Sequence, residues 1–158
     1  MKPSEHAIEQ FLLEHPHKVT PGIPELVELL NKQGKAVFLV SGGFRQVIHP
    51  LADSLGIPLS NVFANTILFN SDGSYAGFDE KEFTCASGGK PRAIRHIKEK
   101  FGFSPVVMVG DGATDLEARL EGAAELFIGY GGVVERKNIA EKADWYIYNI
   151  EDMIKALK

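Results

Sequence analysis

Apolar residues recur at helical spacing along much of the chain, with polar positions between them. Ser4, followed by a stripe of Ile8, Phe11 and Leu12, predicts a capped helix that packs on one side only. Pro50 falls inside the third predicted helix and is expected to bend it. The predicted helices cover residues 4–14, 20–34, 43–56, 91–101, 114–121 and 150–157.

Short apolar runs between these helices predict strands. Residues 36–40 and 106–109 are continuous apolar runs, typical of strands buried on both faces inside parallel sheets. The pair Asp72-Gly73 predicts a β-hairpin between residues 66–69 and 75–78. Further strands are expected at residues 62–64, 126–128 and 145–148. Strands alternating with helices predict an α/β three-layer sandwich with a mostly parallel, Rossmann-like sheet and the hairpin as an excursion from its edge.

Composition narrows the class of ligand. The chain has 158 residues, of which 44% are hydrophobic and 24% charged, and its 17 Lys and Arg against 21 Asp and Glu give a formal charge of −4. This mild acidity argues against nucleic acid and membranes as partners and favours small solutes. The single Cys85 excludes an internal disulfide framework, and no secretory signal is evident, so we expect a reducing compartment such as the cytoplasm. An organelle is the alternative if a transit peptide has been removed.

Polar and glycine-rich segments follow the two apolar strands, where open α/β sheets bind ligands. Ser41-Gly42-Gly43 offers a hydroxyl and accessible N–H groups to an anion such as phosphate. Lys90 places an ammonium at a helix start, where an anionic partner would relieve its conflict with the helix dipole. Asp111 and Asp115 are four residues apart, which predicts one helix face if the helix has begun, and their oxygens suit Mg²⁺. Thr114 adds a hydrogen-bond donor.

Each segment also has an ordinary structural interpretation. Gly110-Asp111-Gly112 is a common tight turn, and an isolated Lys90 is more often a solvated surface lysine. Ser41-Gly42-Gly43 could be a helix cap and nothing more. Joint placement at strand and helix ends favours a site. The residues around Lys90 do not form a Walker A loop, and Gly110-x-Gly112 lacks the third glycine of a dinucleotide fingerprint.

The same segments resemble motifs of a known family, the haloacid-dehalogenase-like (HAD) phosphohydrolases. Ser41-Gly42-Gly43-Phe44-Arg45 is similar to the second motif, Ser87-Gly88-Gly89-Lys90 to the third and Gly110-Asp111-Gly112-Ala113-Thr114-Asp115 to the fourth. Residues 62–65, 75–80 and 127–132 resemble the phosphoserine phosphatase subfamily. The resemblance implies a HAD-like core and Mg²⁺-dependent hydrolysis of a small phosphorylated amino acid, O-phospho-L-serine, to L-serine and phosphate through an aspartyl-phosphate, a step of L-serine biosynthesis.

The resemblance also implies roles for individual residues. Lys90 and Asp115 would be catalytic, Lys90 by neutralising phosphate and nucleophile and Asp115 by supporting the metal site. Asp111 would ligate Mg²⁺. The residues expected to bind phosphate or substrate are Ser41, Gly42, Gly43, Lys90, Thr114 and Arg136.

One family motif has no counterpart. The first, Asp-x-Asp-x-Thr, carries the nucleophile at the end of the first strand, and no such segment precedes Ser41. By resemblance, residues 1–18 are a remnant of the cap region with its connecting helix, and residues 19–158 form an incomplete core whose central first strand is absent. That strand would lie between those ending at Val40 and Val109. We therefore expect exposed sheet edges, self-association or pairing with another chain through them, and little activity from this chain alone.

Two other functions stay open. One is a truncated, non-catalytic relative that binds phosphate or a partner chain. The other is a HAD phosphatase that acts on another small phosphomonoester.

Overall fold

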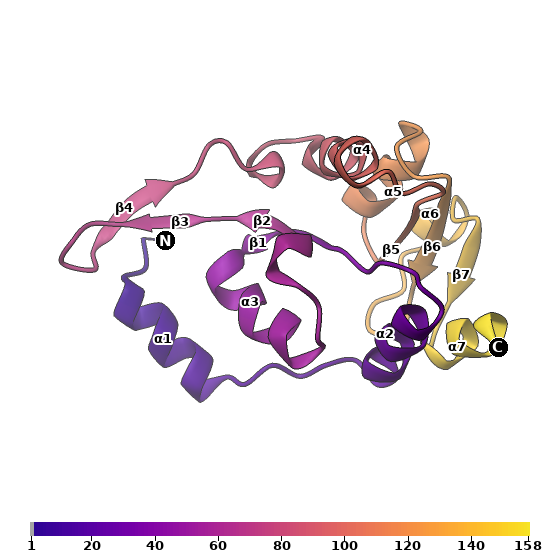
Figure 1. Ribbon diagram of the computed structural model, residues 1–158, viewed down its shortest axis with the longest axis horizontal. Helices are drawn as coiled ribbons and strands as arrows, with labels where there is room; N and C mark the ends of the chain where they lie inside the picture. Colours follow the sequence, from indigo (N-terminus) through magenta and orange to yellow (C-terminus); the bar gives the residue numbers. More distant parts are fainter. Residues whose placement is uncertain (1) are drawn as a thin grey trace.

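The computed structural model describes residues 2–158, which form two small parallel sheets flanked by helices (Figure 1). The first sheet pairs β1 (Leu39–Phe44) with β2 (Val62–Asn65). The second has the order β5 (Val107–Gly110), β6 (Leu126–Tyr130), β7 (Trp145–Ile147). An antiparallel hairpin of β3 (Ile67–Phe69) and β4 (Tyr75–Phe78) extends beyond β2. The predicted α/β class and the hairpin excursion are confirmed.

Helices lie on both sides of the sheets. Within residues 2–158 they are α1 (Glu5–Glu14), α2 (Ile23–Lys32), α3 (Arg45–Ser54), α4 (Gly89–Phe101), α5 (Ala113–Leu120), α6 (Lys137–Ala140) and α7 (Glu151–Leu157), with 3₁₀ turns η1 (Leu59–Asn61) and η2 (Phe83–Cys85). The short α6 was not expected from the sequence. None of the helices in this range is both long and apolar enough to cross a membrane.

The first helix forms as its cap predicts. The Ser4 hydroxyl accepts a hydrogen bond from the Ala7 N–H at 3.1 Å, which satisfies one of the unpaired donors at the start of α1. Ile8 is buried, but Phe11 is half exposed and stacks on His15 with ring centroids 4.6 Å apart. The predicted apolar stripe therefore buries only part of its length.

Two predicted boundaries shift. The second helix begins at Ile23 rather than at residue 20, because Gly22 is left-handed with φ 91° and Pro24 occupies the first turn. The strand expected at 36–40 instead starts at Leu39 and runs to Phe44. Consequently Ser41-Gly42-Gly43 belongs to the end of β1, and α3 starts at Arg45 instead of residue 43.

The prediction that residues 106–109 form a strand buried on both faces is wrong. Met108 is buried against α4 and α5, together with Ile94 and Leu116. Val107 and Val109 point to the opposite face of β5 and are 43% and 39% exposed. An apolar run of this kind indicates burial on both faces only when layers cover both faces, and here only one face is covered.

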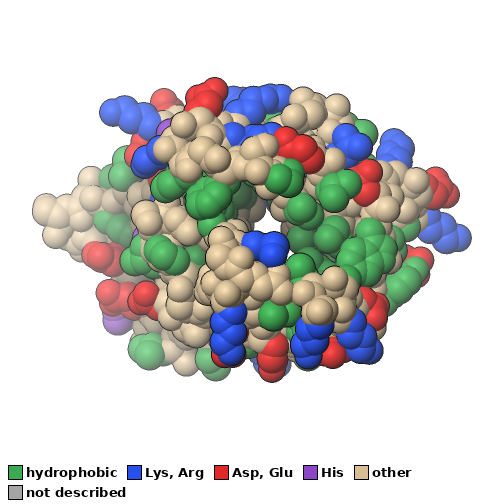
Figure 2. Space-filling model, turned by 45° about the vertical axis from the view of Figure 1, so that its right-hand side comes forward, with side chains coloured by type: hydrophobic (Ala, Val, Ile, Leu, Met, Phe, Trp, Pro, Cys, Tyr) green, Lys and Arg blue, Asp and Glu red, His purple; other side chains and the backbone are tan. Residues whose placement is uncertain are grey.

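The two parallel sheets are not hydrogen-bonded to each other. Among residues 2–158, β1 pairs only with β2, and β5 pairs only with β6, so each sheet has an edge that faces the space between them. Figure 2 shows that side chains do not fill this space: an opening passes through the molecule, with hydrophobic side chains gathered beside it. The expected exposed edges are therefore present.

Two helices connect the sheets from opposite sides (Figure 1). On α2, Leu26 packs with β7 and α7, whereas Val27 packs with α3 and β2. On α4, Ile94 packs with β5 and β6, whereas Ala93 and Ile97 pack with Phe63 of β2. The relative position of the hydrophobic clusters on the two sheets thus depends on α2 and α4.

We expect the 158-residue chain to self-associate, because β5 has an unpaired edge and exposes the apolar side chains of Val107 and Val109 on one face. Light scattering after size exclusion should show oligomers, and replacing Val107 and Val109 together with lysine should shift the population toward the monomer. Leu120→Lys, at an exposed position of α5, is the control and should leave the oligomers in place. A monodisperse wild-type monomer with one cooperative thermal transition would contradict this prediction.

Candidate functional site

Segments that are far apart in the sequence meet in one pocket of about 140 Å³. Gly42 comes from the end of β1, Lys90 from the start of α4 and Thr114 from the start of α5. The lining residues are Gly42, Thr84, Ala86, Ser87, Gly88, Gly89, Lys90, Thr114 and Glu117. Of the residues expected at the site, this lining includes Gly42, Lys90 and Thr114.

A larger hollow lies elsewhere, between the start of α1 and the hairpin turn. Its volume is about 450 Å³, and its charged lining residues are Glu5, Glu9 and Asp72. With three carboxylates and no lysine or arginine in its lining, it does not suit an anion. The smaller pocket is therefore the candidate site.

Lys90 is held by a carboxylate of its own chain. Its ammonium forms an ion pair with Asp115 Oδ1, and the two side chains are only 18% and 7% exposed. The other oxygen, Asp115 Oδ2, accepts hydrogen bonds from the N–H groups of Asp111 at 3.1 Å and Gly112 at 3.0 Å. The anionic partner that we expected for Lys90 is therefore Asp115, and the interpretation of Lys90 as a solvated surface lysine is wrong.

Close packing explains two of the motif glycines. A Cβ atom at Gly89 would collide with the Phe83 carbonyl, and one at Gly110 would collide with the Asp115 carboxylate. Gly110 therefore makes room for the carboxylate that holds Lys90, and Gly89 lets the start of α4 pack against η2. Gly42 is different, because no atom lies within 4 Å of a Cβ built there, so the interior places no demand on that position.

Asp111 faces a different cation. Arg136 Nη1 donates to Asp111 Oδ2 at 2.7 Å and to the Asp111 carbonyl at 3.1 Å. Because α5 begins only at Ala113, the condition under which Asp111 and Asp115 would share one helix face is not met. Asp115 turns inward toward Lys90, whereas the Asp111 side chain is 58% exposed beside Arg136.

The remaining predicted residues flank Gly42. The Gly43 N–H donates to the Ser41 hydroxyl at 3.0 Å, so this short segment is ordered by its own contacts. Neither Ser41 nor Gly43 lines the pocket, whereas Gly42 between them does. Of the predicted residues, Gly42, Lys90 and Thr114 thus share the pocket, Asp115 contacts Lys90, and Asp111 contacts Asp115 and Arg136.

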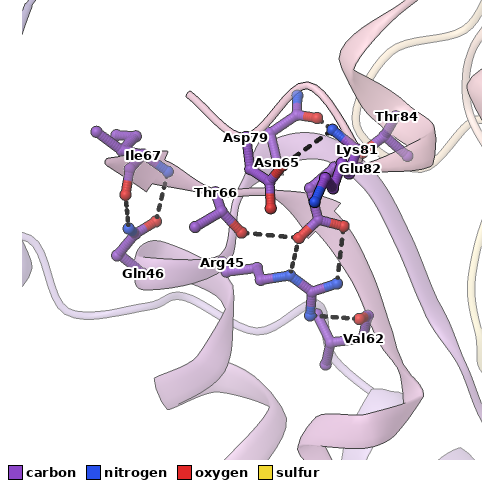
Figure 3. Close-up of polar contacts among 10 residues, drawn as sticks. All are labelled: Arg45, Gln46, Val62, Asn65, Thr66, Ile67, Asp79, Lys81, Glu82 and Thr84. Carbon is purple, nitrogen blue, oxygen red and sulfur yellow. Dashed lines mark hydrogen bonds and ion pairs between the residues drawn. The ribbon is translucent and has the colours of Figure 1, made fainter. Parts of the chain in front are cut away.

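A polar network beside the pocket was not predicted (Figure 3). Arg45 Nε and Nη2 donate to the two Glu82 oxygens at 2.7 and 3.1 Å, and Arg45 Nη1 donates to the Val62 carbonyl at 2.6 Å. The Thr66 hydroxyl donates to Glu82 Oε1 at 2.8 Å. The hydrogen bonds from Arg45 chiefly lower the pKa of Glu82; burial opposes them and the Thr66 bond adds to them.

Sequence spacing gave no signal for these contacts. Arg45 lies 37 residues from Glu82, and Thr66 lies 16 residues from it, so no periodic pattern relates them. Thr84 and Glu117 of the pocket lining were missed for the same reason. Their neighbours in the sequence, Ser87 to Lys90 and Thr114, were the only indication.

Comparison with known proteins assigns the family. The sequence model of the haloacid dehalogenase-like hydrolases matches residues 3–121, which is more than half of the chain. The chain belongs to the haloacid dehalogenase-like hydrolase family. The HAD-like fold expected from the three motifs is thereby confirmed.

Similar curated proteins carry the name phosphoserine phosphatase. The chain is 48% identical over 156 residues to "Phosphoserine phosphatase, chloroplastic" of Arabidopsis thaliana, which covers 99% of this chain and 53% of that protein. It is 48% identical over 158 residues to "Phosphoserine phosphatase" of Bos taurus, covering 100% of this chain and 69% of that one. The chain thus spans about half the length of the first relative.

A solved structure agrees. The crystal structure of a phosphoserine phosphohydrolase-like protein from Francisella tularensis subsp. tularensis SCHU S4 superposes with a TM-score of 0.86 at 31% identity. The match covers 99% of this chain and 71% of that one. The two parallel sheets and the hairpin therefore have a counterpart in a known fold.

Asp115→Asn should destabilise the chain by about 3 kcal/mol, because it leaves the largely buried Lys90 without its counter-ion. The matched control is Glu121→Gln, which breaks the exposed pair with Arg95 and should cost about 0.5 kcal/mol. Urea unfolding at one protein concentration measures both. Equal losses of unfolding free energy in the two variants would show that the Lys90–Asp115 pair contributes no more to stability than an exposed ion pair.

Glu82→Gln should change how stability depends on pH. A carboxyl whose pKa is lowered by folding stabilises the native state above its unfolded value, about 4.3, and this contribution is lost as the pH falls through the folded value. The wild-type free energy of unfolding should therefore fall more steeply below about pH 4 than that of the variant. Glu80→Gln, at an exposed position in the same loop, should follow the wild type. Superimposable curves for wild type and Glu82→Gln would refute this.

Proposed function

We propose that this chain forms the phosphate-binding part of a phosphomonoester hydrolase whose substrate is O-phospho-L-serine. The observation that carries the proposal is the pocket in which Lys90, fixed by Asp115, lies beside Gly42 and Thr114. Phosphoryl transfer needs positioning and charge neutralisation above all, and these groups provide both. The relatives named phosphoserine phosphatase support the choice of substrate.

The residues divide the work as follows in this proposal. Lys90 offsets the negative charge of the phosphoryl oxygens, and Asp115 holds its ammonium in place. The backbone around Gly42 and the Ser41 hydroxyl donate hydrogen bonds to the phosphate oxygens. The Thr114 hydroxyl donates to the substrate. Arg136, which is paired with Asp111, would help to hold the substrate.

Mg²⁺ is the proposed cofactor. Sites for Mg²⁺ use one or two carboxylates together with substrate phosphate and water, and Asp111 fits as one such ligand because its carboxylate is exposed near the pocket. Within residues 2–158 no group of three or more His, Cys, Asp or Glu side chains could hold a metal by itself. When bound, the ion would neutralise charge on the phosphate.

The nucleophile is the missing part of the site. These 158 residues contain no Asp-x-Asp-x-Thr segment, and removal of a covalent nucleophile lowers turnover by on the order of 10⁶ in a well-studied hydrolase. The carboxyl ends of β1 and β5 both lead to the pocket. We infer that a strand paired in parallel with both would also end there, which places its last residues beside Lys90.

The proposal also includes the domain boundaries and the cellular compartment. Residues 1–18 are assigned to a cap-type helical element, supported by the position of α1 against the hairpin turn, where the Glu5 N–H donates to the Gly73 carbonyl at 2.9 Å. Residues 19–158 are assigned to the core. For the compartment, the single Cys85 supports the cytoplasm, and the chloroplastic relative makes an organelle the alternative.

Supplying the missing motif should produce activity. A fusion that places an apolar strand ending in Asp-x-Asp-x-Thr ahead of the chain should release phosphate from O-phospho-L-serine in the presence of Mg²⁺, whereas the chain alone should not. The control is the same fusion with the first aspartate of the motif changed to asparagine. Phosphate release is measured on phosphoserine and on other small phosphomonoesters.

The outcomes separate the alternatives. Turnover of other phosphomonoesters but not of phosphoserine would favour a HAD phosphatase with another substrate. A folded fusion that binds phosphate without turnover would favour the non-catalytic relative. Neither binding nor turnover by a folded fusion would reject the proposal altogether.

A further inference from the structure

Asn65, at the last position of β2, bridges two segments of the candidate site. Its Nδ2 donates to the Gly42 carbonyl at 2.9 Å, and its Oδ1 accepts from the Thr84 hydroxyl at 2.9 Å. Both residues at the far ends of this bridge line the pocket. Figure 3 places Asn65 and Thr84 beside the pair of Arg45 and Glu82.

The orientation of the Asn65 amide is fixed by its neighbours. A carbonyl oxygen only accepts hydrogen bonds, so the NH₂ group must face Gly42. The Asn65 oxygen is then left for Thr84, whose hydroxyl must donate. The reversed amide would set two carbonyl oxygens against each other, so only one arrangement satisfies all groups.

The bond to Gly42 reaches the Ser41 hydroxyl through one peptide plane. The Gly42 carbonyl and the Gly43 N–H belong to the same planar trans unit and point in opposite directions. Holding the carbonyl toward Asn65 therefore turns the Gly43 N–H toward Ser41 Oγ, to which it donates at 3.0 Å. Because Ser41 Oγ accepts this bond, its own O–H is free to donate in another direction.

The bond to Thr84 reaches Lys90. Thr84 lies in η2, and the Gly89 backbone packs directly against Phe83 and Thr84, where a Cβ would collide. Lys90 follows Gly89 at the start of α4. One amide thus connects the segment that carries Ser41 and Gly42 to the segment that carries Lys90.

We propose that Asn65 is a positioning residue for the phosphate-binding segments. It orients the Gly42-Gly43 peptide and, through Thr84, sets the distance between this peptide and Lys90. This inference rests on the proposed function of the pocket. Arg45 and Glu82 also link α3 to the segment before η2 with two hydrogen bonds, so this region of the fold does not depend on Asn65 alone. Loss of the Asn65 bonds should therefore lower anion affinity more than stability.

The test uses inorganic phosphate and the 158-residue chain, with the amide NMR signals of Gly42, Gly43 and Lys90 as readout. Asn65→Leu keeps the approximate shape but removes both hydrogen bonds, and should weaken phosphate binding about tenfold, the equivalent of one to two lost hydrogen bonds. The control is Asn70→Leu, which removes an amide bonded to Ser74 at 2.9 Å in the hairpin turn and should leave phosphate affinity unchanged.

The Thr84 variants give a second, milder arm. Thr84→Val should weaken phosphate binding, whereas Thr84→Ser, which keeps the hydroxyl, should restore it. In phosphate-free protein the Gly43 amide signal should shift in Asn65→Leu and not in Asn70→Leu, because the peptide loses its anchor. If Asn65→Leu fails to fold, the Thr84→Val and Thr84→Ser pair decides.

The outcomes distinguish this inference from the proposed function. Wild-type affinity with an unshifted Gly43 signal in Asn65→Leu, or equal affinities in the two Thr84 variants, would overturn the positioning role. If the wild type binds no phosphate, the proposed function fails, and the Gly43 signal of the phosphate-free variants still decides whether Asn65 orients the peptide. Parallel losses of affinity and thermal stability in Asn65→Leu and Asn70→Leu would also overturn it.

Discussion

The arrangement of this molecule depends on two helices that each pack on two sheets. No strand pairing joins the sheet of β1 and β2 to that of β5, β6 and β7 within the described residues 2–158, so their relative position depends on the helices that pack on both. Leu26 and Val27 on α2, with Ala93 and Ile94 on α4, make those contacts from opposite layers. Close packing is sensitive to small shifts, and the pocket lies where segments from both halves meet.

Local signals in the sequence predicted the elements well and their surroundings less well. Ser4 capped its helix as expected, and the Asp72-Gly73 turn marked the hairpin, because both effects act over a few residues. The prediction that Val107 and Val109 are buried was wrong, since an apolar run does not reveal which of its faces another layer will cover. Asp111 and Asp115 diverged because the helix begins two residues after Asp111.

The candidate site was predicted as a set of segments and not as a set of contacts. Motif positions brought Gly42, Lys90 and Thr114 to one pocket, which follows from the rule that ligands bind at the carboxyl ends of parallel strands. The ion pairs of Lys90 with Asp115 and of Arg136 with Asp111 join residues 25 apart in sequence, beyond the reach of periodicity. The contacts of Asn65 and Thr84 could not be predicted for the same reason, since their partners come from other strands and turns.

The proposed function separates binding from chemistry. Lys90 is paired with Asp115, and the Gly42 carbonyl is bonded to Asn65, so these two contacts of the proposed phosphate-binding pocket form within the described residues. None of these contacts depends on a strand between β1 and β5. A nucleophile delivered by such a strand would meet a seat whose charges and donors are already in place, which is the condition under which electrostatic stabilisation costs no reorganisation during the reaction. Under the proposed function, anion affinity therefore depends on the contacts of Lys90 and Gly42, while turnover depends on what occupies the space between the sheets.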